Sequence, residues 1–234
     1  MQGLLELGEI MLSASQRRLD AVSRNVANVS TPGFKRSAAF DVRLADAAGG
    51  AAASTYAATD FAQGALRLTG RPLDLALTGG AFFQVRVGER IYFTRSGAFE
   101  RDADGRIVDA QGLALQSVSG RDIVIGAGPI EILADGVVLE AGRPIDRIAL
   151  FEPGEPTLLR RSSGALFESP DGAMRLSDAE ELRQGMLESA NVDMAKEMLD
   201  MMSAVRAAEA GARIVQAYDT LIGQSISTFG RGSR

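Results

Sequence analysis

The side chains that carry out most enzyme chemistry are missing from this sequence. Its 234 residues include no histidine and no cysteine, which excludes the usual zinc ligand sets, the Ser-His-Asp triad and the Cys-His pair. A catalytic site would have to use carboxylates, lysine or tyrosine, yet the carboxylate pairs Glu180–Glu181 and Glu152/Glu155 have no recognisable cleft around them. We therefore expect that the protein is not an enzyme and has no cofactor and no small-molecule substrate.

One acidic segment has part of the spacing of a calcium loop. Asp102 and Asp104 are followed by Asp109, but the glutamate that closes an EF-hand loop is absent. The Asp104-Gly105 step is typical of a hairpin turn instead. We expect no metal at this position.

The charge pattern argues against two further classes of partner. The formal net charge is −5 and the 25 basic residues are scattered, so we expect neither a nucleic-acid surface nor a polybasic membrane anchor. No apolar run approaches the roughly 18 residues that indicate a membrane span, so we expect no direct membrane insertion. Residues 1–18 lack a basic region followed by a continuous apolar stretch, and we therefore expect no cleaved secretory signal.

Both ends of the chain have the period of a long amphipathic helix. Near the N-terminus, over about residues 4–29, apolar residues recur every seven positions, with Gly8 and Ser15 as weak members. Near the C-terminus the same period extends from an expected N-cap at Asn191 to Gly230, with Gly211 as a local weakness. The predicted packing seams consist of Leu5, Leu12, Leu19, Val22, Val26, Val29, Met198, Met201, Val205, Val215, Ile222 and Ile226.

The middle of the chain has the alternating pattern of an antiparallel β domain. Short apolar runs such as FFQVRV (82–87) and VVLE (137–140) are separated by turn pairs such as Gln111-Gly112 and Asp135-Gly136. Residues 44–59 are small and featureless, and we interpret them as a flexible linker or loop. The predicted fold is α+β, with a helix and turn over 1–35, a linker or extended segment over 36–72, a β-rich domain over 73–176 and a helix over 177–234.

A specific stop follows the first helical pattern, in the sequence NVANVSTPGFKR (25–36). Pro32 cannot continue a helix and restricts Thr31 to extended geometry, while Gly33 suits a turn with positive φ. Phe34 can then fold back as an apolar anchor. Asn25 and Asn28 lie on one face of the predicted helix near the seam, where both side chains can fix the register between helices. Asn28 can also cap the helix end or adopt the left-handed conformation.

The two amphipathic stripes need partners. An isolated amphipathic helix is marginally stable in water, so each stripe must pack against the other terminus of the same chain or against helices of neighbouring copies. The second arrangement would make an assembling protein, whose termini are disordered or only partly helical in the monomer. From the residues alone, a plain helix terminator followed by a loop remains an alternative for the 25–36 stretch.

Three segments resemble one protein family. LDAVSRNVANVSTPGFK (19–35) is similar to the N-terminal signature of the bacterial flagellar rod and hook proteins. The C-terminal segment GMLESANVDMAKEMLDMMSAVRAAEAGARIVQAYDTLIGQSI (185–226) and the middle segment LDLALTGGAFFQVRVGERIYFTRSGAFERDADGRIVDAQGLALQ (73–116) also resemble that family, in the expected order.

The resemblance implies a structural subunit of the flagellar basal body. Such subunits polymerise helically through their terminal helices into the axial drive shaft, with the coiled-coil-like helices inside and the β domain outside. They leave the cytoplasm through the flagellar type III export apparatus without a cleaved signal. The implied partners are other rod subunits, further copies of this chain and that apparatus, and the implied location is the periplasm-spanning rod.

Within the family the chain is most similar to the proximal rod member with a single β domain, and its short, Ala-rich segment 36–60 favours that member. A distal rod or hook-type axial subunit is the alternative. Two other classes are a non-flagellar coiled-coil surface fibre and a carboxylate-based glycan hydrolase. The first does not predict the 25–36 stop together with the TRSGAFERDADG hairpin, and the second would need a carboxylate pair in a cleft.

Overall fold

A computed structural model describes residues 2–45, 51–170, 172–177 and 181–231. The chain divides into two compact units, of which the first comprises residues 1–27, 37–59 and 193–234 and the second residues 28–36 and 60–192. The predicted α+β class is confirmed, with N- and C-terminal helices in contact and an antiparallel β region between them in the sequence.

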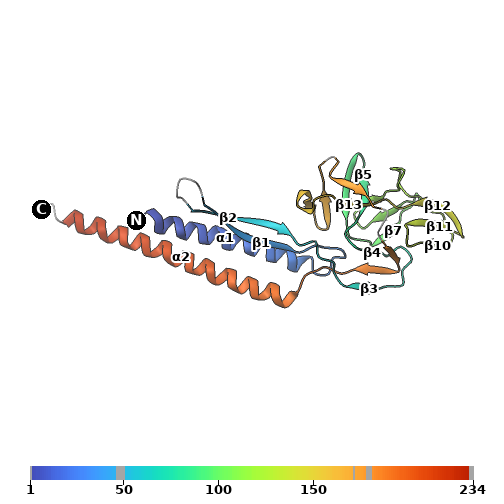
Figure 1. Cartoon of the computed structure of the whole chain (residues 1–234). Coiled ribbons are helices and arrows are strands. Elements are labelled where there is room, and N and C mark those ends of the chain that lie inside the picture. Colours follow the sequence, from blue (N-terminus) through green and yellow to red (C-terminus); the bar gives the residue numbers. More distant parts are fainter. Residues whose placement is uncertain (1, 46–50, 171, 178–180, 232–234) are drawn as a thin grey trace. The chain divides into compact units, whose positions relative to one another are not determined.

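Unit 1 consists of two long helices and a hairpin. Helices α1 (Gln2–Ala27) and α2 (Met194–Arg231) lie side by side and run in opposite directions, as Figure 1 shows. Strands β1 (Ser37–Ala45) and β2 (Ala51–Thr59) pair antiparallel and pack along α1. Neither helix, over its described residues, has a stretch apolar and long enough to cross a bilayer.

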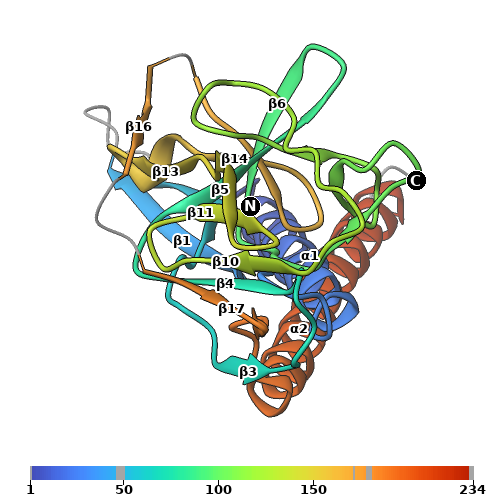
Figure 2. The same ribbon diagram turned by 90° about the vertical axis from the view of Figure 1, so that its right-hand side faces the viewer.

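Unit 2 is built from short antiparallel strands (Figure 2). Its largest sheet, among the described residues, has the path β14-β15-β6-β5-β9-β8-β7, with β13 and β16 attached beside β5. These strands are β5 (Phe82–Val87), β6 (Arg90–Thr94), β7 (Phe99–Arg101), β8 (Ile107–Asp109), β9 (Ala114–Leu115), β13 (Leu150–Pro153), β14 (Arg160–Ser163), β15 (Leu166–Glu168) and β16 (Met174–Leu176).

Three smaller sheets complete unit 2. One contains β10 (Ile130–Ile132), β11 (Val137–Glu140) and β12 (Arg143–Arg147). The other two pair segments far apart in the sequence: β3 (Leu66–Leu68) with β18 (Met186–Glu188), and β4 (Leu75–Thr78) with β17 (Glu181–Gln184). A single 3₁₀ turn, η1, covers Pro156–Leu158.

The core of unit 2 is made of aliphatic and aromatic side chains from these strands. One cluster contains Leu75, Phe83, Phe99, Ile123 and Ile148 among others, and a second surrounds Phe82 and Phe167. The aromatic rings meet edge to face, as between Phe83 and Phe99, whose centroids are 5.4 Å apart. This is the interior expected of an alternating strand pattern, in which every second residue points to one face.

Several strands and turns agree with the sequence pattern. Strands β5 and β11 match the predicted runs residue for residue, and Gly105, Gly112 and Gly136 have positive φ at the predicted turns. Two further alternating runs in the sequence, IVI (123–125) and IDRIALFE (145–152), also predict strands. The first forms only an isolated bridge, Arg106↔Val124, and the second is divided between β12 and β13. Their buried residues, such as Ile123 and Ile148, pack in the core without a regular strand ladder.

Two predicted boundaries need correction. The loop predicted over 44–59 instead contains strand β2 and the end of β1, because these Ala-rich residues pair antiparallel through their backbone. The helix predicted from about Asn191 begins at Met194, and much of the segment 177–188 forms strands β17 and β18 of unit 2. The helix ends at Arg231, next to the glycine that was expected to end it.

Candidate functional site

The helix pair of unit 1 is the first candidate region. The buried positions of α2 recur every seven residues, at Glu197, Ala204 and Gly211. On α1 Gly8, Ser15 and Val22 have the same spacing, and Ala21 and Asn25 are buried as well. Apart from Val22, these side chains are small or polar. A Cβ on Gly8 would lie 2.8 Å from Val215 Cγ2, and a Cβ on Gly211 would lie 3.2 Å from the Gly8 carbonyl oxygen. The two helices therefore approach each other closely at this pair of glycines.

The predicted seam residues divide into two groups in the single chain. Val22 is buried, and Leu5, Leu12, Leu19, Val26, Val29, Met201 and Val215 are partly buried. Met198, Val205 and Ile222 are 57%, 41% and 37% exposed, although their side chains are large and apolar. The side chain of Ile226 lies outside the described residues. Helix α2 thus presents apolar residues to solvent that the single chain does not cover.

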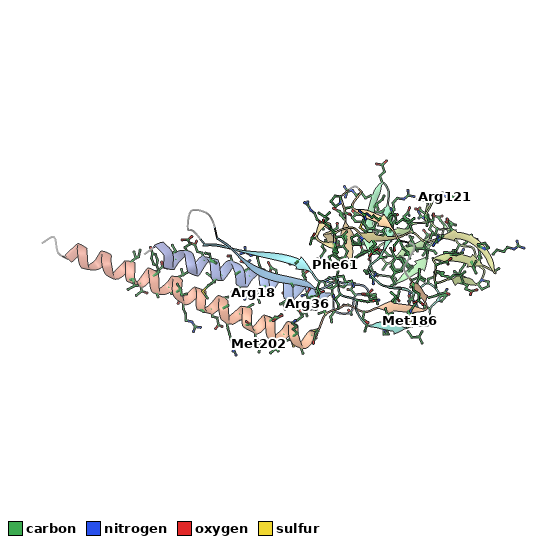
Figure 3. All side chains as sticks on the ribbon, in the orientation of Figure 1. Arg18, Arg36, Phe61, Arg121, Met186 and Met202 are labelled. Atoms are coloured by element: carbon green, nitrogen blue, oxygen red, sulfur yellow. The ribbon has the colours of Figure 1, made fainter. Side chains whose placement is uncertain are left out.

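The exposed apolar positions of α2 are more numerous than the predicted seam. Leu199, Met202 and Leu221 are each more than half exposed as well, and Figure 3 labels Met202 on α2. Monomeric proteins rarely expose this much contiguous apolar surface without a partner.

A buried polar network links α1, α2 and β1 around Asn25. Its Nδ2 donates to the carbonyl oxygen of Ser37 at 2.8 Å and to Oε2 of Glu197 at 2.9 Å. Its Oδ1 accepts a hydrogen bond from the Ser37 amide at 2.8 Å. Asn25 and Glu197 are fully buried, so these bonds satisfy groups that would otherwise be costly to bury.

The turn motif belongs to unit 2. Asn28 accepts from Thr31 twice, through its carbonyl oxygen to the backbone amide and through Oδ1 to the hydroxyl. Asn28 does not adopt the left-handed conformation that was one of its two predicted roles. Gly33 has φ +66°, and a Cβ there would lie 2.2 Å from the backbone carbon of Arg95. Only glycine fits such a position.

The residues after the turn anchor it firmly. Phe34 is buried, and the guanidinium of Arg161 lies 4.6 Å from its ring centroid. Arg161 also donates to the carbonyl oxygen of Lys35. The Gly33 amide donates to the carbonyl oxygen of Glu188 at 2.8 Å. Pro32 is partly buried.

A buried ion cluster completes this anchor. Lys35 Nζ donates to Oε1 of Glu188 at 2.7 Å and to the Ala62 carbonyl at 2.8 Å, while Arg95 Nε donates to Oε2 of Glu188 at 3.0 Å. Burial lowers the pKa of Lys35 below its ordinary 10.5, and the Glu188 carboxylate offsets only part of that effect. Two cations share one carboxylate here, so Glu188 is the group on which the cluster depends.

The N-cap of α2 is Asp193 and not the expected Asn191. The Asn191 side chain accepts from the Arg36 amide at 2.6 Å and donates to the carbonyl oxygens of Asp60 and Ala62. Asp193 is the N-cap of α2, because its Oδ1 accepts from the Ala195 and Lys196 amides. The prediction of Asn191 as the cap was therefore wrong by two residues.

The acidic segment forms a turn rather than a cation site. Asp102 Oδ1 accepts from the Asp104 and Arg106 amides, and its Oδ2 accepts from Arg106 Nε at 2.8 Å. Partial desolvation would raise the pKa of Asp102, but the hydrogen bonds from Arg106 outweigh it and the pKa lies below the ordinary value. The described residues contain no cluster of three or more metal-ligating side chains.

Sequence reasoning missed several of the residues that matter most. Lys35, Arg95 and Glu188 lie in three separate segments, and only the rarity of lysine in the chain could have drawn attention to the first. Gly8 and Gly211 were taken as weak points, although the seven-residue spacing of small residues signals close helix packing. Glu197 was hidden by the apolar residues around it.

Comparisons with known proteins agree with this arrangement. Three family models match: the flagella basal body rod protein model over residues 12–35, the flagellar hook protein FlgE/F/G D1 domain over 76–140, and the flagellar basal body rod FlgEFG protein C-terminal model over 183–228. The chain is thus similar to the flagellar basal-body rod and hook proteins in an N-terminal, a middle and a C-terminal segment. The first match covers the turn motif up to Lys35, and the third covers Glu188 and most of α2.

The relatives that align over nearly the whole chain are rod proteins named FlgF and FlgG. It is 27% identical to the flagellar basal-body rod protein FlgF of Caulobacter vibrioides, and 99% of each chain is covered. It is 29% identical to FlgF of Mesorhizobium japonicum over the whole of both chains, and 28% identical to FlgG of Bacillus subtilis over 91% of this chain and 93% of that one. These similarities support a flagellar basal-body rod protein, FlgF-like or FlgG-like, with a structural and non-enzymatic role.

Proposed function

We propose that this protein is the proximal rod subunit and that it polymerises helically through α1 and α2. The observation that carries the proposal is the set of exposed apolar side chains on α2, including Met198, Val205 and Ile222. A contact between two different surfaces, repeated in every copy, generates a helical filament when its rotation does not close into a ring. Rod subunits of the same family, including further copies of this chain, are the partners with matching helices.

The proximal assignment is supported by two features. Both FlgF relatives align over essentially their full length, and unit 2 forms one continuous β unit after the short hairpin β1–β2. A distal rod subunit is the second candidate, because FlgG of Bacillus subtilis aligns over most of the chain at a similar identity. Export through the flagellar export apparatus without a cleaved signal, and a position in the periplasm-spanning part of the rod, follow from this proposal.

The location is tested on isolated particles. Basal bodies are purified with detergent and their proteins are identified by mass spectrometry before and after the hook is removed. A proximal rod subunit remains in the particle at a few copies. A chain that is lost with the distal rod, or is found only in the medium, would contradict the assignment.

The assembly surface is tested by charge substitution. We expect Val205→Asp to abolish incorporation into basal bodies and motility, because it places a carboxylate in the apolar row. The matched control is Gln216→Asp on an exposed position of the same helix, which should leave both unchanged. Circular dichroism of each purified variant checks that the helices still form. A motile Val205→Asp strain would show that this face of α2 is not part of the assembly surface.

A further inference from the structure

The loop between Asn25 and Ser37 has both of its ends in unit 1, where they are hydrogen-bonded to each other. Asn25 bonds the Ser37 amide and carbonyl groups with its own Oδ1 and Nδ2, which closes the two ends of the intervening loop. The same Nδ2 donates its second hydrogen to Glu197 of α2. Because Ser37 N–H can only donate, the orientation of the Asn25 amide is fixed by the network.

The tip of this loop, residues 28–36, is held in unit 2. The Gly33 amide and the Lys35 ammonium group bond Glu188, and the Arg36 amide bonds Asn191 Oδ1. Lys35 and Glu188 are both about 1% exposed, so water cannot replace either partner while the loop is docked. The stretch from Asn25 to Lys35 therefore contains a residue that joins α1 to α2, which is Asn25, and a residue of the buried ion cluster, which is Lys35.

We propose that Asn25 couples the pairing of α1 with α2 to the docking of loop 28–36 in unit 2. Ordering the backbone of a loop costs conformational entropy, and a loop whose ends are already held has less conformational freedom to lose. When α2 brings Glu197 to Asn25, the amide is fixed in the orientation that also holds Ser37. Helix pairing thereby lowers the cost of docking the loop, and by linkage a docked loop favours helix pairing to the same extent.

This coupling is a property of the single chain and does not depend on the assembly proposal. If α2 does pack against neighbouring copies, the coupling extends to them, because contacts that stabilise the helix pair would also stabilise the loop. Val22 provides a comparison, since it is buried on the same helix one turn before Asn25 and is not part of the polar network.

Hydrogen–deuterium exchange on the full-length chain, read peptide by peptide, tests the proposal. We expect Asn25→Ala to accelerate exchange about tenfold or more both in α2 and in the unit 2 segments 60–68 and 186–190, as the loss of buried hydrogen bonds implies. Val22→Ala should accelerate exchange in α1 and α2 and, through Asn25, to a smaller extent in those unit 2 segments. In an Asn25→Ala background, Val22→Ala should cause no further change in unit 2, because the coupling side chain is gone. Glu197→Gln keeps an acceptor for Asn25 Nδ2 but loses the charge, so its effect on unit 2 should lie between wild type and Asn25→Ala.

Two results would overturn the coupling. Unit 2 exchange that is unchanged in both Asn25→Ala and Glu197→Gln would show that the loop docks independently of the helix pair. Unit 2 exchange that rises further when Val22→Ala is added to Asn25→Ala would show that the whole chain opens together and that Asn25 has no special role. If Asn25→Ala does not fold, Glu197→Gln takes its place in both comparisons.

Discussion

Between α1 and α2 the most buried positions include Gly8, Ser15, Ala204 and Gly211, whereas the core of unit 2 is filled by phenylalanine, leucine and isoleucine. Hydrophobic stabilisation scales with buried apolar area, at about 25 cal/mol per Å², so small side chains contribute little to the helix pair. The pair gains close backbone approach, and several large apolar residues of α2 stay on the outside. Unit 2 builds a core from large apolar side chains, although some of them, such as Leu68 and Val124, are exposed as well. The two regions therefore differ in what fills their interiors.

The largest expected effect concerns the buried ion cluster of unit 2. Glu188→Gln would leave Lys35 and Arg95 buried without a carboxylate, and we expect it to lower the free energy of unfolding by about 3–5 kcal/mol. Lys35→Met leaves Glu188 paired with Arg95, and we expect a smaller loss of about 1–3 kcal/mol. Urea unfolding measures both.

An exposed ion pair provides the control for this prediction. Glu181 lies 3.3 Å from Arg183 and both side chains are about half exposed, so Glu181→Gln should cost less than about 1 kcal/mol. Equal losses for Glu188→Gln and Lys35→Met would show that the charge imbalance in the cluster does not determine its stability.

An intermediate effect is expected at the glycine contact of unit 1. Gly211→Ala should strengthen the intrinsic helix by about 1 kcal/mol, but its Cβ would press on the Gly8 carbonyl oxygen and on Leu12. We expect overpacking of about 1–3 kcal/mol to outweigh that gain, so the helix pair becomes less stable. Thermal unfolding followed by circular dichroism at the helical band measures the change.

The same helix offers a matched glycine. A Cβ on Gly223 would meet nothing within 4 Å, so Gly223→Ala should stabilise α2 or leave it unchanged. If Gly211→Ala is also stabilising, α1 and α2 do not need glycine to pack at this point. The difference in packing between the helix pair and the core of unit 2 would then be smaller than described above.

The smallest expected effect is a pH dependence caused by Lys35. Its pKa in the folded chain is below the ordinary 10.5, so at pH values between the two the unfolded chain binds more protons than the folded chain. The free energy of unfolding contributed by this group should therefore rise as the pH is raised through the folded pKa towards 10.5. Urea unfolding of wild type and Lys35→Met across that range isolates the effect, because other groups titrate in both. Parallel curves would contradict it.

The sequence predicted the helices and many strands because their periods are set locally. Strand β5 alternates along its whole length, and the seven-residue repeats extend through α1 and α2. The turn at Gly33 was also predictable, because Pro32 and Gly33 each have strong backbone preferences.

The tertiary contacts of the candidate site could not be predicted in the same way. Lys35, Arg95 and Glu188 meet because strands from distant parts of the chain are brought together, and no local pattern encodes that. Strand β2 was missed because five of its nine residues are alanine, which strands use less often than β-branched and aromatic residues. Which neighbours cover Met198, Val205 and Ile222 is a property of an assembly, not of one chain.

The burial of Lys35 has a practical consequence for labelling. The chain has two lysine side chains, and the other, Lys196, is exposed in the first turn of α2. An amine-reactive reagent should therefore modify the folded protein at Lys196 among its lysines and reach Lys35 only when loop 28–36 leaves its site. The ratio of modification at Lys35 to modification at Lys196 would therefore report how often that loop opens.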